Sequence, residues 1–217
     1  MNDLIRATEL LQLFRGKSFP DTVSAIEKSF VGASKATVSP LLSKRSLNDD
    51  LLHAALLIKR NASQIDEIVH ALGILLALSS ILDQNERIES LSLAAGNTGK
   101  GFDLETDKRI AEFTFIQWQG GPEVIRQNKI FKDFYFLAEA EALKLRELYV
   151  IGTDHALKFF NSKRSLRQIL DGNAKLGNSF RERYGTTFRV VSEYYQAKKN
   201  VVCIKDVRSH LVMMKDI

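Results

Sequence analysis

Two strand-like segments joined by a short polar loop make up residues 101–118, GFDLETDKRIAEFTFIQW. The segments 101–106 and 109–118 are rich in Phe, Ile and Thr, which are residues that favour strands. Only Asp107 and Lys108 separate them, so we expect an antiparallel hairpin with a two-residue loop. The side chains that this hairpin places opposite each other decide how the rest of the sequence is interpreted.

The hairpin register sets two acidic side chains opposite each other. Leu104 faces Ala111 on one face of the hairpin, and Asp103 faces Glu112 on the other. Directly opposed side chains start about 5 Å apart, where like charges are destabilising. A shared proton or a cation relieves such a pair, and oxygen ligands suit Mg²⁺ or Mn²⁺. Glu105 is a third acid on the same face, nearer the turn.

A different register or a different balance of charge would remove this cation site. Asp-Lys is not a favoured hairpin turn, and a slip of one residue would send the two carboxylates to opposite faces. Asp103 and Glu112 could also be ordinary strand residues on a wet face, balanced by Lys100 or Arg109. The residues leave these alternatives open.

The segments around the hairpin predict a mixed α/β core. Helical spacing of apolar residues predicts a helix from Ser63 to about Leu82, and alternation predicts a strand over 88–93. Pro122 suits the first turn of a helix that extends to about Lys144, and a short apolar strand follows at 148–151. The order is helix, three strands, helix, strand. We also expect helices over 2–14, 20–30, 51–58, 154–160, 165–170, 173–184 and 187–197, a connection over 32–40 and a last strand over 201–204.

This order of elements, with an Asp on the second strand and a Glu on the third, resembles the PD-(D/E)XK nucleases, the restriction-endonuclease-like superfamily. The resemblance covers residues 63–152 and implies that Asp103 and Glu112 are the motif acids. It implies that the Phe113 carbonyl helps them to hold Mg²⁺ or Mn²⁺. Glu67 stands where an additional metal-binding Glu occurs on the first core helix, although a first-turn charge at a helix N-terminus is a simpler role.

The chain departs from the family at Thr114, which stands at the position of the motif lysine. A hydroxyl can form hydrogen bonds but supplies no charge, and one lost electrostatic group typically lowers a rate about 10²–10³-fold. Arg126 and Lys129, on the following helix, are candidates for the missing charge. Gln127 falls where some exonucleases carry Gln-x-x-x-Tyr, although Phe131 replaces the Tyr. An ordinary solvated helix face is the alternative for all three polar residues.

Length and pattern predict three regions in the 217 residues. Residues 1–62 are expected to form a helical N-terminal extension, and residues 63–152 the nuclease-like core. Residues 153–217 are expected to form a helical or mixed region packed on that core.

Charge is unevenly distributed along the chain. Residues 61–119 carry four Lys/Arg against nine Asp/Glu, whereas residues 120–217 carry eighteen against eleven. Acids gathered within a basic chain can hold a cation while the basic part attracts a polyanion, although chance clustering on solvated faces gives the same pattern.

Several classes of protein are disfavoured. The one cysteine, Cys203, excludes an internal disulfide framework, and the four scattered His residues do not form a zinc motif. The glycine-rich segment 96–101 departs from the phosphate-loop pattern. The apolar run 68–82 is shorter than the roughly 20 residues that span a bilayer, so we expect a buried helix and no membrane association. No signal peptide is evident, which predicts a cytoplasmic protein.

The sequence therefore predicts a Mg²⁺- or Mn²⁺-dependent enzyme that hydrolyses phosphodiester bonds in nucleic acid, with DNA as the expected substrate. One alternative is a catalytically lapsed relative that binds nucleic acid or a partner protein without cleavage. Another is an interaction protein whose helices bind other chains. Association into a homo-oligomer is left open.

Overall fold

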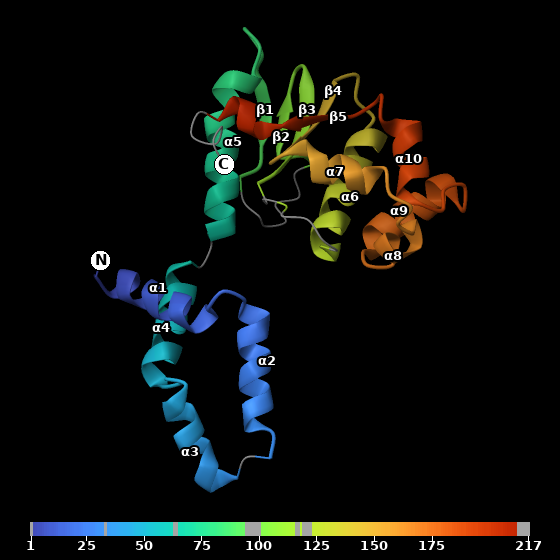
Figure 1. Ribbon diagram of the computed structural model, residues 1–217. Helices are drawn as coiled ribbons and strands as arrows, with labels where there is room; N and C mark the ends of the chain where they lie inside the picture. The colour runs from blue at the N-terminus through green and yellow to red at the C-terminus, as the bar shows by residue number, and fades with distance from the viewer. Residues whose placement is uncertain are drawn as a thin grey trace. The chain divides into compact units, whose positions relative to one another are not determined.

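The computed structural model describes residues 2–32, 34–62, 65–93, 101–115, 118 and 123–211 (Figure 1). The chain forms two compact units, Met1–Ile65 and Asp66–Ile217. Some sequence predictions fall on residues outside the described ranges: the helix start at Ser63, most of the glycine-rich segment with Lys100, and Pro122.

The first unit is made of helices with few buried side chains. Ala7 and Ala54 are buried, on two helices that pack against each other, α1 and α4. The predicted connection over 32–40 is wrong, because a helix begins there. Its start is fixed by a capping interaction in which the Ser34 N–H donates to Thr37 Oγ1 at 2.9 Å. The helices are α1 (Asn2–Arg15), α2 (Phe19–Phe30), α3 (Lys35–Lys44) and α4 (Asp49–Asn61).

The second unit is built on a five-stranded sheet in the order β1-β2-β3-β4-β5. The first three strands form an antiparallel meander, and β4 and β5 then run parallel to β3. The helix before the meander and the helix between β3 and β4 complete the predicted order, and the mixed α/β class is confirmed. The elements are α5 (Ile65–Ile81), β1 (Ile88–Leu91), β2 (Leu104–Thr106), β3 (Arg109–Thr114), α6 (Val124–Glu139), β4 (Leu145–Val150) and β5 (Cys203–Asp206).

The predicted register of the central hairpin is confirmed. Leu104 pairs with Ala111, and Glu105 pairs with Ile110. At the turn the Arg109 N–H donates to the Thr106 hydroxyl at 2.8 Å, which supports an Asp-Lys loop that has no favoured turn residues of its own.

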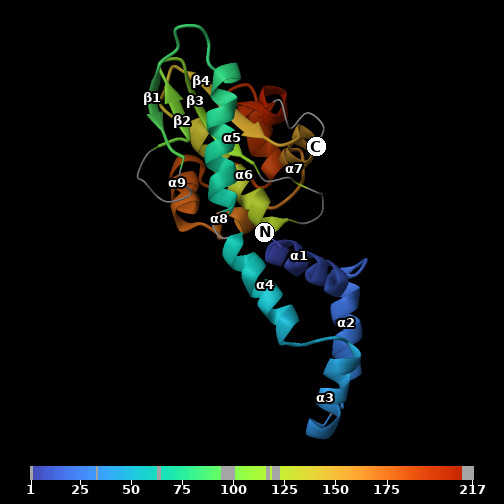
Figure 2. The same ribbon diagram turned by 90° about the vertical axis from the view of Figure 1, so that its left-hand side faces the viewer.

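Two helices cover opposite faces of the sheet (Figures 1 and 2). On one face, Ile74 and Ala77 of α5 pack with Phe113. On the other face, Phe131 and Phe134 of α6 pack in a cluster with Ile110 and Leu148. Alternate residues of β3 therefore face different helices, and Glu112 shares the α6 face with Ile110.

Only one side of α5 is buried. Gly73, Ile74, Ala77 and Ile81 are buried, so the prediction of a buried helix over 68–82 holds for its inner face alone. The stretch Asp49–Ile81 is long and apolar enough to cross a membrane by length and composition, which is weak evidence, and the predicted lack of membrane association stays a prediction. The exposed apolar residues of α5 are Ile65, Ile68, Val69, Leu72, Leu75 and Leu76.

The C-terminal helices pack in the same cluster as α6. Phe160, Phe180 and Tyr194 are fully buried there. Glu139 at the end of α6 accepts hydrogen bonds from the Tyr184 and Tyr194 hydroxyls at 2.7 and 2.8 Å. These elements are α7 (Thr153–Phe160), α8 (Leu166–Leu170), α9 (Ala174–Tyr184), α10 (Val191–Lys198) and the short 3₁₀ helix η1 (Val207–His210).

Candidate metal centre

The two predicted motif acids come together at one end of the central hairpin. Asp103 lies directly before β2, one residue beyond the pair formed by Leu104 and Ala111, which places it opposite Glu112. The Phe113 N–H donates to Asp103 Oδ2 at 2.9 Å and fixes the orientation of that carboxyl. The Asp103 side chain also forms a hydrogen bond with Glu112.

The surroundings of Glu112 favour its protonated form. Burial, the charges of Asp133 and Asp103, and the hydrogen bond with Asp103 raise its pKa to about 10, and the Lys132 charge only partly opposes this. Two carboxyls this close cannot both be ionised without a cation between them.

A third carboxyl, which the sequence analysis did not single out, lies beside this pair. Asp133 projects from the middle of α6, is 3% exposed, and has an Oδ2 with no hydrogen-bond partner among the described residues. Burial raises its pKa to about 6, although Lys129 and Lys132 oppose that rise. Its charge is the strongest of those that disfavour the ionised form of Glu112.

The helix α5 brings a histidine to the site. His70 Nε2 lies 3.4 Å from Asp103 Oδ1, and both side chains are largely buried, at 14% and 17% exposed. The His70 ring also contacts Phe115 edge to face, with centroids 6.0 Å apart. Glu67, the residue predicted for this helix, is exposed in its first turn, one turn before His70.

Two further predicted residues have buried polar atoms that are left unpaired. Thr114 follows on β3 and is 9% exposed, and its Oγ1 has no partner in the described part of the chain. Gln127 Oε1 on α6 is likewise buried and unpaired within that part. Unpaired buried oxygens are uncommon in folded proteins and are typical of sites that bind a ligand or ordered water.

The cations predicted on α6 have different surroundings. Arg126 forms an ion pair with Glu123, so part of its charge is already used. Lys129 is half-buried and attracts Asp133, and Lys132 attracts both Asp133 and Glu112. Lys132 was not among the predicted residues, yet it is the cation that acts on both acids.

Helical spacing contained a signal for both missed residues. His70 continues the inner stripe of α5 that Gly73, Ile74 and Ala77 form. Asp133 likewise falls at the spacing of a buried stripe on α6, between Ile130 and Leu137. A polar residue within an apolar stripe must be buried, and that is the pattern by which they could have been found.

The donor set available for an ion is two carboxylates and a backbone carbonyl. Within the described ranges, no group of three or more His, Cys, Asp or Glu side chains could hold a metal ion as placed. Asp103, Glu112 and the Phe113 carbonyl would leave several positions to water, which is how Mg²⁺ is usually bound. The hydrogen-bonded carboxyl pair and the unpaired oxygen of Asp133 fit a cation at this place.

The opposite face of the hairpin carries a buried ion-pair network. The Arg109 guanidinium donates to both oxygens of Glu86, at 2.6 and 2.7 Å, and to Glu147 at 2.9 Å. Burial alone would raise the pKa of Glu86, but hydrogen bonds from Arg109 and Thr106 outweigh it and lower that pKa to about 2. Lys205 and the Tyr149 hydroxyl also contact Glu147, so this network is fully paired and structural.

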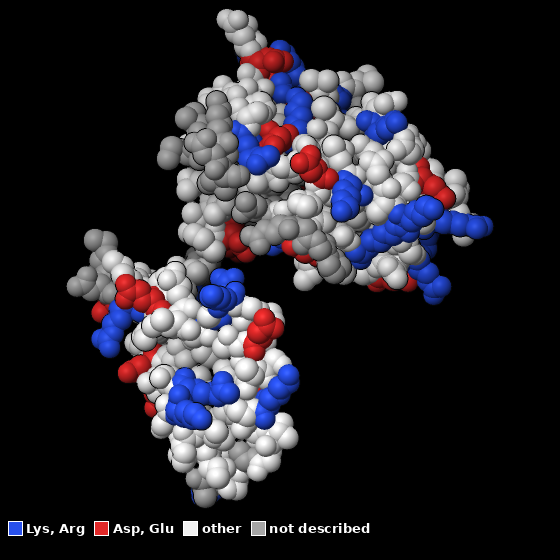
Figure 3. All heavy atoms as spheres, in the orientation of Figure 1, with Lys and Arg blue, Asp and Glu red and all other residues white. Residues whose placement is uncertain are grey.

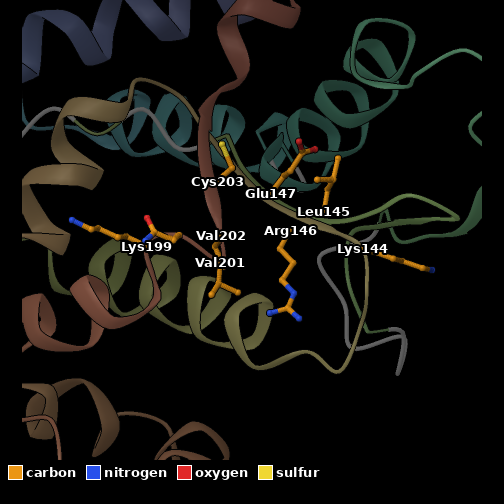
Figure 4. Close-up of a pocket in the computed structure, with 9 residues that line it drawn as sticks. Lys144, Leu145, Arg146, Glu147, Lys199, Val201, Val202 and Cys203 are labelled. Carbon is orange, nitrogen blue, oxygen red and sulfur yellow. The ribbon is translucent and has the colours of Figure 1, made fainter.

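A shallow pocket of about 380 Å³ lies at the beginning of β4 and β5 (Figure 4). Lys144 is already paired with Glu89 and Glu105, and the Arg146 guanidinium donates to backbone carbonyls of α6 and the following loop. Figure 4 shows the side chains of Lys144 and Lys199 pointing away from each other. None of the predicted site residues lines this pocket, and its cations do not converge on one ligand.

Comparisons of the chain with models of protein families, with curated proteins and with solved structures gave no match. The functional argument therefore depends on the geometry of the carboxyl cluster.

Proposed function

We propose that the second unit is a divalent-cation-dependent nuclease of the PD-(D/E)XK type, and that the cluster around Asp103 and Glu112 is its active site. The single observation that carries this proposal is the pair itself. The two largely buried acids form a hydrogen bond with each other, and one of them is oriented by a backbone N–H of the strand that carries the other. Such a pair is poorly suited to a purely structural role, because its members would repel each other once both were ionised.

Each residue has a part in the proposed reaction. Asp103, Glu112 and the Phe113 carbonyl would hold Mg²⁺ or Mn²⁺. When bound, a divalent ion activates water and stabilises the charge that develops on the phosphate. Lys132 and Lys129 lie on the adjacent helix and act electrostatically on the acids, so we assign to them the charge that Thr114 does not supply.

Nucleic acid is the proposed partner because residues 120–217 carry eighteen Lys/Arg against eleven Asp/Glu. Lys and Arg side chains gather over α8 and α9 on the face shown in Figure 3. Arg181 and Arg183 are about half exposed and paired with Asp171 and Glu139. Lys/Arg side chains at such positions can contact a phosphate backbone without sequence preference.

The test compares cleavage of plasmid and single-stranded DNA by the wild type, by Asp103→Asn/Glu112→Gln and by Glu105→Gln, with Mg²⁺ or Mn²⁺. Glu105 is a matched control, because it lies on the same sheet face and is paired with Lys144. We expect the double variant to lose at least about 100-fold in rate and the control to retain activity. Cleavage that is absent in the wild type with both ions, or unchanged in the double variant, would overturn the proposal.

The second candidate is a lapsed nuclease that binds DNA without cleaving it, and Thr114 at the lysine position is the observation that favours it. It predicts binding that weakens steeply with salt and does not depend on Mg²⁺. Lys132→Met separates the two candidates further. In an active enzyme it should lower the cleavage rate about 10²-fold while Mn²⁺ still binds, whereas in a lapsed protein there is no rate to lower.

A further inference from the structure

Asp133 occupies a position that packing does not explain. It lies among apolar residues of α6, is 3% exposed, and leaves Oδ2 without a hydrogen bond among the described residues. A buried carboxyl without partners is strongly unfavourable. The packing of α6 alone therefore gives no reason for an acid at this position.

The neighbours of Asp133 show where that ligand would be. The charges of Asp103 and His70 act on Asp133, and the charge of Asp133 acts on Glu112, so the Asp133 carboxyl lies in the electrostatic field of the carboxyl pair. Lys129 and Lys132 attract Asp133, but neither donates a hydrogen bond to its Oδ2 in the described part of the chain. The cluster thus has a hydrogen-bond acceptor, Asp133 Oδ2, for which the described residues supply no donor.

We propose that Asp133 is an outer carboxylate of the cation site, which accepts a hydrogen bond from water in that site through its free Oδ2 and so positions the water. The inference rests on the proposed function, and it adds a residue that the family resemblance does not supply. A direct ligand role is less suitable, because the described residues offer no set of three side-chain ligands. An acceptor outside the ligand set needs only the free oxygen that Asp133 has.

The experiment measures Mn²⁺ binding by calorimetry and thermal unfolding with and without Mn²⁺, for the full chain. The variants are Asp133→Asn, which keeps the shape of the side chain, and Glu105→Gln as the matched carboxyl-to-amide control. We expect Asp133→Asn to weaken Mn²⁺ binding about 10–100-fold, the usual effect of losing an outer partner. Without Mn²⁺ the same variant should unfold at the wild-type temperature or higher, because it removes an unpaired buried acid. Its stabilisation by Mn²⁺ should be smaller than that of the wild type.

The outcomes separate this inference from the proposed function. If Asp133→Asn binds Mn²⁺ with wild-type affinity, or is destabilised or unfolded without Mn²⁺, Asp133 is a structural residue and the inference is overturned. If the wild type does not bind Mn²⁺ at all, the inference and the proposed metal site fall together. If Mn²⁺ binds and Asp133→Asn weakens it, the inference stands even where no DNA is cleaved, and only the nuclease proposal falls.

Discussion

Glu112 links ion binding to proton release. Its pKa of about 10 means that the carboxyl is protonated at pH 7.5, whereas a metal ligand must be ionised. Binding of Mn²⁺ should therefore release about one proton per ion at this pH. Calorimetric titration in buffers of different ionisation enthalpy measures this number directly. A binding enthalpy that is the same in every buffer would contradict it, and Glu112→Gln should release none from this position.

The same residue shapes the dependence of stability on pH. The pKa of Glu112 is raised on folding from 4.5 to about 10, so the folded chain binds a proton that the unfolded chain has lost over this window. The contribution of Glu112 is fully present below pH 4.5 and declines as pH rises toward 10. Urea unfolding of wild type and Glu112→Gln at several pH values should show a smaller decline in the variant. Parallel curves would show that Glu112 does not keep its proton.

At the scale of elements, close packing of α5 on the end of β3 depends on Gly73. A Cβ at this position would overlap the Phe115 ring, which also touches His70. Gly73→Ala should therefore lower the free energy of unfolding by about 1–3 kcal/mol, as overpacking does. Urea denaturation measures this loss. Gly177→Ala does not serve as a control, because a Cβ there would meet the Leu170 backbone. Gly32→Ala is the control for the added volume, because a Cβ there would lie in open space and the substitution adds only the strain of a positive φ.

The ion-pair network on the α5 face connects the loop after α5 with β3 and β4. Arg109→Met leaves Glu86 and Glu147 buried without their main partner, so it should lower the free energy of unfolding by about 3–5 kcal/mol. Adding Glu86→Gln should recover part of this loss, because it removes the acid that Arg109→Met leaves unpaired. The other acid, Glu147, still has Lys205. Chemical denaturation of the single and double variants tests this, and equal losses in both would contradict it.

The sequence could predict those elements that are fixed by interactions between residues close together in the chain. The hairpin register was predictable because a two-residue turn constrains both strands, and Leu104 does pair with Ala111. The helix α3 was not found, since Pro40 and the polar residues before it suggested a connection, and the local cap at Ser34 was overlooked.

The site was predictable only in part. Glu112 lies on β3 and Asp103 directly before the neighbouring strand β2, so their approach follows from the turn. His70 and Asp133 reach the same cluster from helices on opposite faces of the sheet. Their approach depends on how α5 and α6 pack, and local spacing could show only that each is buried.

At the scale of the whole molecule, every residue of the candidate site belongs to the second unit, Asp66–Ile217. Both buried clusters and the Arg109 network are also within it. We expect residues 63–217, expressed alone, to fold and to bind Mn²⁺ as the full chain does. Circular dichroism and calorimetry check this, with Asp103→Asn/Glu112→Gln in the same fragment as the control. An unfolded fragment, or one that has lost Mn²⁺ binding, would show that residues 1–62 are required.

The unsatisfied carboxyl of Asp133 also has an evolutionary consequence. A single nucleotide change converts Asp to Asn, and in a lineage released from ion binding that change would be neutral or stabilising. Random drift should therefore erase this acid soon after the activity is lost. Among descendants of the same ancestor, we expect Asp133 to persist where Asp103 and Glu112 persist, and to disappear early where either has gone.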